Sequence, residues 1–350
     1  MEIKEIIYRN FFRIMPKAGI RYSTVGLDIG NSSVKLVKTE RDNNAYRISA
    51  LGVEEVKSGN VKDAVKAVLA KAGVENKRVN IGLCGKQTVI RCVVVPEMEE
   101  TDFKNSLKYE AAKYIPFPLS EVIWDSKILK HNIESSKMLV LIAAAKKDFV
   151  TQKLKMILDL GLEPCVLDID SLALVNAFDL LSNKVKPDKK ASAGISVLLN
   201  IGSHLSSLVF LEDNLVRFGR DIAFGGNSIT QKIAAKLNIN FGEAEKNKLS
   251  LEKTGEIKGI IESSLTDLAN ELRLSFDYYE SQTGKTAQTV YLSGGGSSLD
   301  GICVFMGSAM NILFEAWNPL AALKQDDGLD KKLSEGFSSR FAVAAGLSLR

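Results

Sequence analysis

The sequence predicts an α/β protein built from two similar halves. The stretch VGLDIGNSSVKLVKTE, residues 25–40, places two apolar strands on either side of a short polar turn. The stretch VLLNIGSHLSSLVFLED, residues 197–213, repeats this form about half a chain length later. One such turn is most often an ordinary hairpin, since Gly and Asn tolerate positive φ angles. Two at this spacing indicate a duplicated fold in which both turns can face a common cleft.

The composition is that of an ordinary globular protein. Hydrophobic residues make up 45% and charged residues 25% of the 350 residues, which is typical of soluble proteins. The longest clean apolar run, MLVLIAAA at 138–145, is too short to span a bilayer and predicts a buried strand. The N-terminus lacks the uncharged core of a signal peptide, so we do not expect export. The four cysteines are scattered and only two histidines occur, so reduced thiols in a cytoplasm fit better than disulfides or a zinc site.

The net charge of +4 is concentrated in a basic leader, residues 1–21. Its apolar residues follow a helical spacing that ends at Pro16. Such an amphipathic helix can lie on an anionic membrane surface, on its own domain or on a partner, and the sequence leaves these alternatives open. The rest of the chain is almost neutral, so we expect no nucleic-acid partner.

Apolar patterns predict the elements of the first part of the chain in order. Strands are expected at 24–29, 33–39, 46–53, 79–84, 88–95, 122–129, 138–145 and 163–168. A helix at 61–72 begins at the N-cap Asn60 and ends before Gly73. A second helix carries Phe103, Leu107, Ala111 and Tyr114 on one face and ends before Pro116. Further helices are expected at 149–160 and 170–181.

The second part begins after an exposed connection at 182–194, which has no apolar period. Strand patterns fill 194–222, a helical period fills 228–280, and the strand VYLS runs into GGGSSLDGI. The segment TGKT at 283–286 is not a P-loop, because Tyr279 stands where that motif needs Gly and a helical pattern precedes it.

These turns suit a nucleoside triphosphate. Two opposed turns can hold a phosphate chain through backbone N–H groups and serine hydroxyls. The polar acceptors Asp28 and Asn200 beside them can hold the waters of a phosphate-bound Mg²⁺. The cluster Gly294–Gly296 allows close approach of a flat base or a phosphate at the start of a helix. A tight strand–helix turn is the more ordinary explanation of that third cluster.

Several longer words resemble one family. They are VPEMEETDFKNSLKYEAAKYIPFPLSEVIWD (95–125), RDIAFGGNSIT (220–230), LRLSFDYYES (272–281), YLSGGGSSLDGI (291–302) and FAVAAGLSLR (341–350). In these words the chain resembles the type IV pilus assembly PilM family, which is related to the cell-division protein FtsA. Both belong to the superfamily of actin, heat-shock chaperone and sugar-kinase ATPases. The resemblance runs from about residue 22 to the C-terminus.

The resemblance implies an actin-like ATPase fold, with duplicated ribonuclease-H-like halves and an inserted subdomain of the FtsA/PilM type. The first half would span 22–78 and be completed by 166–185 and the C-terminal helix 338–350. The inserted subdomain would span 79–165. The second half would span 194–337, with a helical nucleotide-capping subdomain at about 228–286.

The resemblance also implies site residues for ATP and Mg²⁺. The first phosphate loop would hold Asp28, Gly30, Asn31 and Ser32, and the second Asn200, Gly202 and Ser203. The glycine pair that closes near the phosphates and ribose would be Gly225 and Gly226, Glu271 would contact the ribose or base, and the adenosine motif would hold Gly294, Gly295 and Ser297. Asp28 and Asn200 would bind Mg²⁺ through water. Asp28 and Asp170 are the catalytic candidates, although Asp170 is equally an N-cap of its helix.

Asn200 departs from the family pattern, because superfamily members that hydrolyse ATP usually carry Asp there. An amide accepts a hydrogen bond from a metal-bound water but removes a full negative charge. We therefore expect ATP binding with weak or no ATPase activity.

The function that the resemblance implies is a cytoplasmic scaffold at the inner face of the inner membrane. Its partners would be the N-terminal tail of a PilN-like membrane protein and other pilus assembly platform proteins, and it can form a homodimer. The tail could lie in a groove anchored by Tyr109, Tyr114 or Phe117, although ordinary core is the more usual explanation of such aromatics. Two alternatives stay open: an FtsA-like or actin-like filament protein, and a small-molecule kinase with Asp170 as its base.

Overall fold

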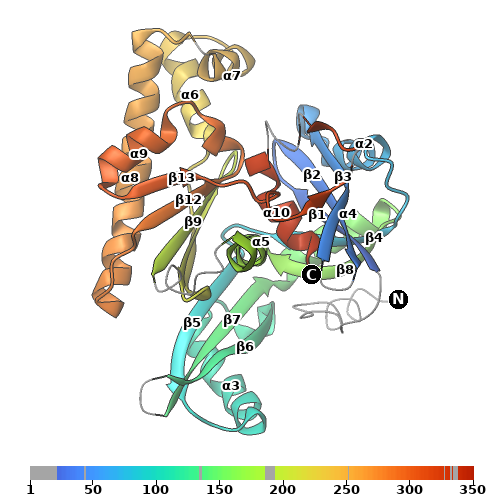
Figure 1. Ribbon diagram of the computed structural model, residues 1–350, viewed down its shortest axis with the longest axis vertical. Coiled ribbons are helices and arrows are strands. Elements are labelled where there is room, and N and C mark those ends of the chain that lie inside the picture. Colours follow the sequence, from blue (N-terminus) through green and yellow to red (C-terminus); the bar gives the residue numbers. More distant parts are fainter. Residues whose placement is uncertain are drawn as a thin grey trace.

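Three β-sheets organise the chain in the computed structural model (Figure 1). The structure describes residues 22–42, 45–133, 136–185, 194–250, 252–326, 328–331, 333 and 338–350. The basic leader and most of the connection at 182–194 lie outside these residues. No helix in the described ranges is long and apolar enough to cross a membrane.

The first sheet has six strands in the order β14-β3-β2-β1-β4-β8. Their bounds are β1 Tyr22–Ile29, β2 Ser33–Asp42, β3 Ala45–Glu55, β4 Arg78–Leu83, β8 Glu163–Ile169 and β14 Lys324–Gln325. Helices α2 (Val61–Lys71) and α4 (Lys147–Asp159) cover one face, where they share a core with Val25, Leu27 and Leu36. The Asn60 side chain accepts a hydrogen bond from the Asp63 N–H, which confirms the predicted N-cap.

The second sheet has five strands in the order β11-β10-β9-β12-β13. Their bounds are β9 Ile195–Ile201, β10 Ser206–Glu212, β11 Leu215–Ile222, β12 Thr289–Ser293 and β13 Leu313–Ala316. In both sheets an antiparallel meander is followed by two parallel strands, β4 and β8 in the first, β12 and β13 in the second. The duplicated, actin-like α/β fold is therefore confirmed.

Four helices accompany the second sheet: α6 Gly226–Leu237, α7 Phe241–Leu249, α8 Gly255–Thr283 and α9 Ile302–Met310. The long helix α8 stacks Tyr279 on Phe210 of β10, with 4.6 Å between ring centroids. Because α8 runs to Thr283, the segment TGKT follows a helix, as expected for a sequence that is not a P-loop. The glycine cluster opens into a 3-10 turn at Gly295–Ser298, and α9 begins only at Ile302. The predicted helix at the cluster is therefore displaced by several residues.

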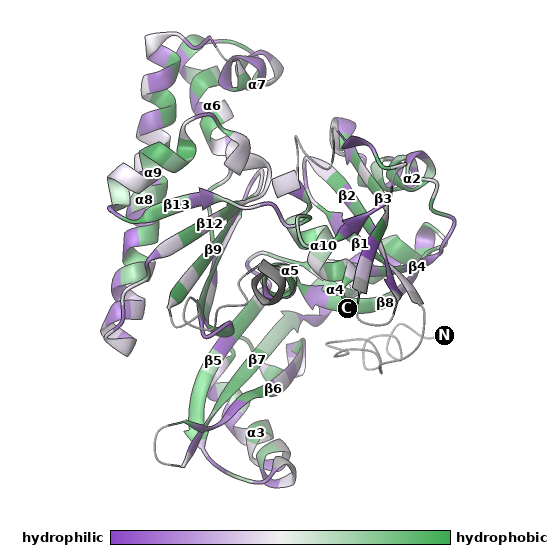
Figure 2. Cartoon of the chain, in the orientation of Figure 1, coloured by the Kyte–Doolittle hydropathy of each residue, from purple (hydrophilic) through white to green (hydrophobic). Residues whose placement is uncertain are grey.

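A third sheet, β5-β7-β6, projects from the first half (Figure 1). Its strands are β5 Thr88–Pro96, β6 Val122–Ile133 and β7 Lys137–Lys146, and helix α3 (Glu100–Tyr114) packs on one face. Phe103, Leu107 and Ala111 are buried there, as the helical pattern predicts. Figure 2 shows β5 and β7 as largely hydrophobic strands. This unit is narrower than the expected 79–165, because β4 and β8 pair within the first sheet.

Two helices lie between the halves. Helix α5 (Asp170–Val185) follows β8, and helix α10 (Ala342–Ser348) lies at the C-terminus. All seven residues of α10 are buried. A Cβ at Gly346 would lie 1.8 Å from the carbonyl oxygen of Ala173 in α5, and one at Gly26 would lie 2.1 Å from that of Ala344. The backbones of α10, α5 and β1 therefore pack against each other with no room for a side chain.

This packing predicts opposite effects of one substitution at two glycines. Gly346→Ala forces backbones apart in the core, so we expect the free energy of unfolding to fall by about 1–3 kcal/mol or more. Gly259→Ala, on α8, adds a Cβ that meets nothing, so it should raise stability by about 0.5–1 kcal/mol. Urea unfolding followed by circular dichroism measures both values. Equal stability of the two variants would contradict the packing described here.

Candidate functional site

The two predicted phosphate turns have the same geometry. The Gly30 N–H donates to the Ser33 carbonyl (3.2 Å) and the Gly202 N–H donates to the Leu205 carbonyl (2.9 Å). A Cβ on Gly30 or Gly202 would lie 2.9 or 2.8 Å from that same carbonyl oxygen. Both glycines are therefore needed for the turn itself. Their own N–H groups are used inside the turn, so an anion would be bound by other groups of each loop.

The two halves meet at a polar contact between the loop after β4 and strand β11. The Gly85 N–H donates to one carboxylate oxygen of Asp221 (2.8 Å), and the Ser207 hydroxyl donates to the other (2.7 Å). Gly85 belongs to the first half, whereas Ser207 and Asp221 belong to the second. Asp221 was not among the predicted site residues. It links the halves close to the second turn, because it stands opposite Ser207, which stands opposite Asn200.

Asp170 and Cys84 lie beside this contact. The Asp170 carboxylate comes so close to β4 that a Cβ on Gly82 would lie 1.9 Å from its Oδ1. Burial, followed by the negative charge of Asp28, raises the pKa of Asp170 to about 7. The charge of Asp170, followed by burial, raises the pKa of the Cys84 thiol. Asp170 is the first residue of α5, and its carboxylate accepts a hydrogen bond from Cys84. Its role in a nucleotide site stays a prediction.

Asp28 has a cationic partner. Its carboxylate lies 3.2 Å from the ammonium group of Lys35, and both side chains are mostly buried. Lys35 stands directly opposite Asp28 in the β1–β2 pair. The first loop therefore carries a carboxylate whose charge is already balanced by a neighbour.

A ladder of polar side chains crosses the second sheet. Asn200 stands opposite Ser207, which stands opposite Asp221, and Ser293 lies beside Asn200 on the other side. Residues directly opposite in neighbouring strands point to the same face. The Ser293 hydroxyl donates to the Asn200 side-chain oxygen (3.1 Å). This ladder aligns the second loop with the contact between the halves.

The predicted glycine pair packs directly on the second loop. The Gly226 N–H donates to the Gly202 carbonyl (2.9 Å), and a Cβ on Gly225 would lie 2.5 Å from the backbone of Ser203. The buried ammonium group of Lys248, on α7, donates to the Gly226 carbonyl (3.1 Å) and to Glu245 (2.7 Å). The helical unit α6–α7 is thereby fixed to the second turn.

The third glycine cluster also joins this group. Gly294 has a φ of 86°, and a Cβ there would lie 2.4 Å from the carbonyl oxygen of Ile201. Its N–H donates to the Ser339 carbonyl (2.9 Å), just before the C-terminal helix. The Ser297 hydroxyl donates to the Gly294 carbonyl (2.7 Å), so it stabilises the turn. Direct contacts therefore unite the second loop, the glycine pair and the third cluster.

Glu271 has a different set of contacts. Its carboxylate, on α8, accepts a hydrogen bond from Arg220 (2.8 Å). Arg220 and Asp221 are consecutive in β11, so their side chains point to opposite faces of the sheet. No contact among the described residues joins Glu271 to the loops, and its role at a ribose or base stays a prediction.

The residues around the two turns include few groups that could hold a metal ion by themselves. No group of three His, Cys, Asp or Glu side chains within the described ranges could hold one. Asp28 is paired with Lys35, and Asn200 is neutral. These residues fit a cation that is carried in with phosphate oxygens and water, as the sequence predicts, better than a site made of protein ligands alone.

A separate cavity of about 150 Å³ lies where four parts of the chain meet. Its lining comes from the inserted sheet, from α5, from the β10–β11 hairpin and from the last residue: Asp125, Ser126, Lys127, Leu129, Leu141, Ala143, Leu172, Val175, Asn176, Asn214, Leu215, Val216 and Arg350. Burial, followed by the charge of Arg350, lowers the pKa of Lys127. A cavity of this size can hold a ring-sized apolar group.

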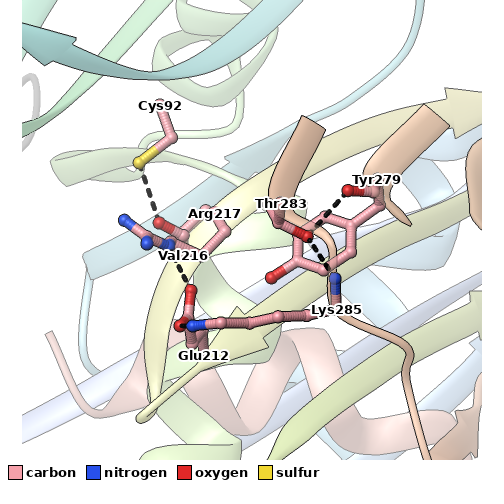
Figure 3. A network of polar contacts seen from close by, with 7 residues as sticks. All are labelled: Cys92, Glu212, Val216, Arg217, Tyr279, Thr283 and Lys285. Atoms are coloured by element: carbon pink, nitrogen blue, oxygen red, sulfur yellow. Dashed lines mark hydrogen bonds and ion pairs between the residues drawn. The ribbon is translucent and has the colours of Figure 1, made fainter. Parts of the chain in front are cut away.

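The wall formed by β11 is braced by the polar network of Figure 3. The Cys92 thiol on β5 donates to the Val216 carbonyl (2.8 Å), and Glu212 pairs with both Arg217 (2.6 Å) and Lys285. A Cβ on Gly219 would lie 2.5 Å from the side chain of Ile90. The inserted sheet therefore rests directly on strand β11 of the second half.

The three predicted anchor aromatics lie on the other side of the inserted sheet. Tyr114 and Phe117 pack against the core under α3, and Tyr109 is 83% exposed on α3. None of them lines the cavity. The sequence missed the cavity because its lining is scattered over four segments that only the fold unites.

A family model described as type IV pilus assembly protein PilM matches residues 26–350. A chain from a solved structure described as a PilM-PilN type IV pilus biogenesis complex is 27% identical, with a TM-score of 0.83. That match covers 95% of this chain and 99% of the other. The ethanolamine utilization protein EutJ from Carboxydothermus hydrogenoformans matches at 14% identity and a TM-score of 0.54, over 99% of this chain and 98% of its own. The likeness to EutJ shows the fold alone.

The raised pKa of Asp170 predicts a pH dependence of stability. The folded chain holds a proton on Asp170 up to about pH 7, whereas the unfolded chain releases it near 3.8. This group's contribution to stability is therefore lost as the pH rises through that window. In Asp170→Asn this loss should be absent. From pH 5 to pH 8 the free energy of unfolding should therefore fall less in the variant than in the wild type. Urea unfolding at both pH values measures the change. Asp102→Asn, on exposed α3, is the control, and an unchanged slope in Asp170→Asn would refute the assignment.

Proposed function

The chain belongs to the type IV pilus assembly protein PilM family, and from this premise we propose an ATP-binding scaffold that binds the N-terminal cytoplasmic tail of a PilN-like membrane protein. The observation that carries the proposal is the similarity, over 95% of the chain, to a chain of the PilM-PilN complex. The scaffold would be peripheral to the inner membrane, at its cytoplasmic face. Contacts with other platform proteins and a homodimer belong to the same proposal.

We assign the tail to the cavity between the inserted sheet, helix α5 and the β10–β11 hairpin. An extended segment seated there would contact the inserted sheet, α5 and the β10–β11 hairpin at once. Val94, which is 48% exposed, lies on the same face of the inserted sheet as Leu141 and Ala143. Apolar surface therefore continues from the cavity along the sheet. Apolar side chains of the tail would fill the cavity, and Asp125, Lys127 and Arg350 at its rim would select polar neighbours.

We assign ATP to the cleft between the two turns. The residues that support this are the first loop with Asp28, Gly30, Asn31 and Ser32, the second with Asn200, Gly202 and Ser203, and the contacting glycines Gly225, Gly226, Gly294 and Gly295. Of these residues, Asn31, Ser32 and Gly295 are exposed, so a phosphate or a base can approach the turns there. A bound Mg²⁺ would supply positive charge against the phosphates, with Asp28 and Asn200 holding its water ligands.

Two elements reach both proposed sites. Helix α5 carries Asp170 at its first residue and Leu172 and Val175 in the cavity wall. Strand β11 carries Asp221 at the contact between the halves and Val216 in the cavity wall. Closure of the halves on a nucleotide would therefore change the shape of the tail cavity. No observation favours a filament protein or a small-molecule kinase over this scaffold.

The neutral Asn200 predicts binding with slow turnover, well below about 1 per second. Asn200→Asp restores a carboxylate near the phosphates, so it should make ATP affinity more dependent on Mg²⁺, by about tenfold. Calorimetry with ATP in Mg²⁺ and in EDTA measures the ratio, and phosphate release measures turnover. Asn311→Asp, at the exposed end of α9, is the matched control. Wild-type turnover near typical enzyme values would contradict this prediction.

The cavity assignment predicts which surface binds the tail. Leu129→Arg and Leu215→Arg place a charge on opposite walls of the cavity, and each should weaken binding by about tenfold or more, since an apolar contact is replaced by a buried charge. Fluorescence anisotropy with a labelled N-terminal tail of a PilN-like protein measures affinity, with and without Mg-ATP.

The control for the tail experiment is Tyr109→Arg on α3, which should bind the tail like the wild type. Loss of binding only in Tyr109→Arg would move the site to the α3 face. If the wild type binds no tail in either condition, the scaffold proposal loses its main support.

A further inference from the structure

The middle glycine of the third cluster is not explained by packing. A Cβ on Gly294 would lie 2.4 Å from the Ile201 carbonyl oxygen, and one on Gly296 would lie 2.2 Å from the Ile201 side chain. A Cβ on Gly295 would meet no backbone and would lie 4.0 Å from the Nε atom of Arg340. Gly295 is also exposed. The fold therefore requires the outer two glycines, whereas the open surface at Gly295 lies beside a guanidinium group.

Arg340 is held at this position by its backbone. It lies in the short 3-10 turn Ser338–Phe341, directly before the buried helix α10. The carbonyl of its neighbour Ser339 accepts the Gly294 N–H (2.9 Å). The backbone of Arg340 is therefore fixed beside the glycine turn, and its Nε atom lies 4.0 Å from where a Cβ on Gly295 would be.

Arg340 also lies between groups from both halves. Burial lowers the pKa of Arg340, and the charges of Glu55 and Glu245 oppose that shift. Glu55 stands opposite Ser33 in the first hairpin, whereas Glu245 binds Lys248 beside the glycine pair. The guanidinium group therefore lies near three of the elements assigned to the nucleotide.

We propose that Arg340 stacks its guanidinium plane on the base of the bound nucleotide, over the open surface of Gly295. A guanidinium is planar, always charged and weakly hydrated, so it stacks on aromatic rings. A side chain at position 295 would occupy the space that the base needs. The inference deepens the proposed ATP site and rests on it. It assigns recognition of the base to a residue outside the two proposed phosphate loops.

The test compares ATP with inorganic tripolyphosphate, which has no base. Arg340→Ala and Arg340→Lys should each weaken ATP binding by about 5- to 30-fold, the range of a desolvated cation–π contact, and leave tripolyphosphate binding unchanged. Lys keeps the charge but loses the plane, so it separates stacking from simple attraction. Calorimetry with Mg²⁺ measures both ligands. Arg47→Ala, which breaks an exposed ion pair with Glu40 and Asp326, is the control and should bind like the wild type.

A second variant tests the same contact without removing the Arg340 side chain, whose loss could itself destabilise the fold. Gly295→Ala adds one methyl group that meets no backbone, and it should weaken ATP but not tripolyphosphate. Full ATP affinity in Arg340→Lys, or an equal loss of both ligands in Arg340→Ala, would overturn the stacking assignment. If the wild type binds neither ligand, the proposed nucleotide site itself fails, whereas normal ATP binding by every variant would overturn only the role of Arg340.

Discussion

The close packing of helix α10 against α5 and β1 is the constraint on which the cleft depends. Glycines at 26 and 346 let the three backbones approach each other, and the last carbonyls of α10 are bound by strand side chains. Thr39 donates to the Ser348 carbonyl (2.7 Å) and Asn80 donates to the Leu347 carbonyl (2.8 Å). These contacts fix α5, β1 and β4 relative to one another. The polar groups of the first half, from Asp28 to Asp170, are therefore positioned by a helix that is itself fully buried.

The second half packs on this frame through a shared apolar core that includes Leu198, Val209 and Trp317, and strand β11 adds two polar contacts to it. Its Asp221 binds Gly85 of the first half, and its Val216 accepts the Cys92 thiol of the inserted sheet. A rotation of one half against the other would change both contacts together, because a single strand transmits the movement. This arrangement would couple the proposed nucleotide site to the proposed tail site through one motion.

Local patterns predicted the strands, the N-cap at Asn60, the paired turns and the linking helix, since each depends on residues close in sequence. The cleft residues Cys84, Asp221, Lys248 and Arg340 could not be predicted in this way, because each is an ordinary residue of a strand, helix or loop until the fold brings it to a glycine turn. Of these residues, Asp221 was the easiest to predict from the sequence, because it stands four residues before the glycine pair in RDIAFGG, residues 220–226. Tyr114 and Phe117 pack against the core under α3, which is the alternative that the sequence favoured. Helical periodicity could not tell which face of the inserted sheet α3 covers.

The charges of the side chains around the two turns favour the binding of a nucleotide over its hydrolysis. Sequence alone places several carboxylates near the turns, which would repel a triphosphate. In the fold, Lys35 balances Asp28, a backbone N–H and a hydroxyl bind both oxygens of Asp221, and Asp170 keeps its proton up to about pH 7. Asn200 adds no charge. A cleft of this kind tolerates an anion, because each carboxylate is neutralised or bound by a different group.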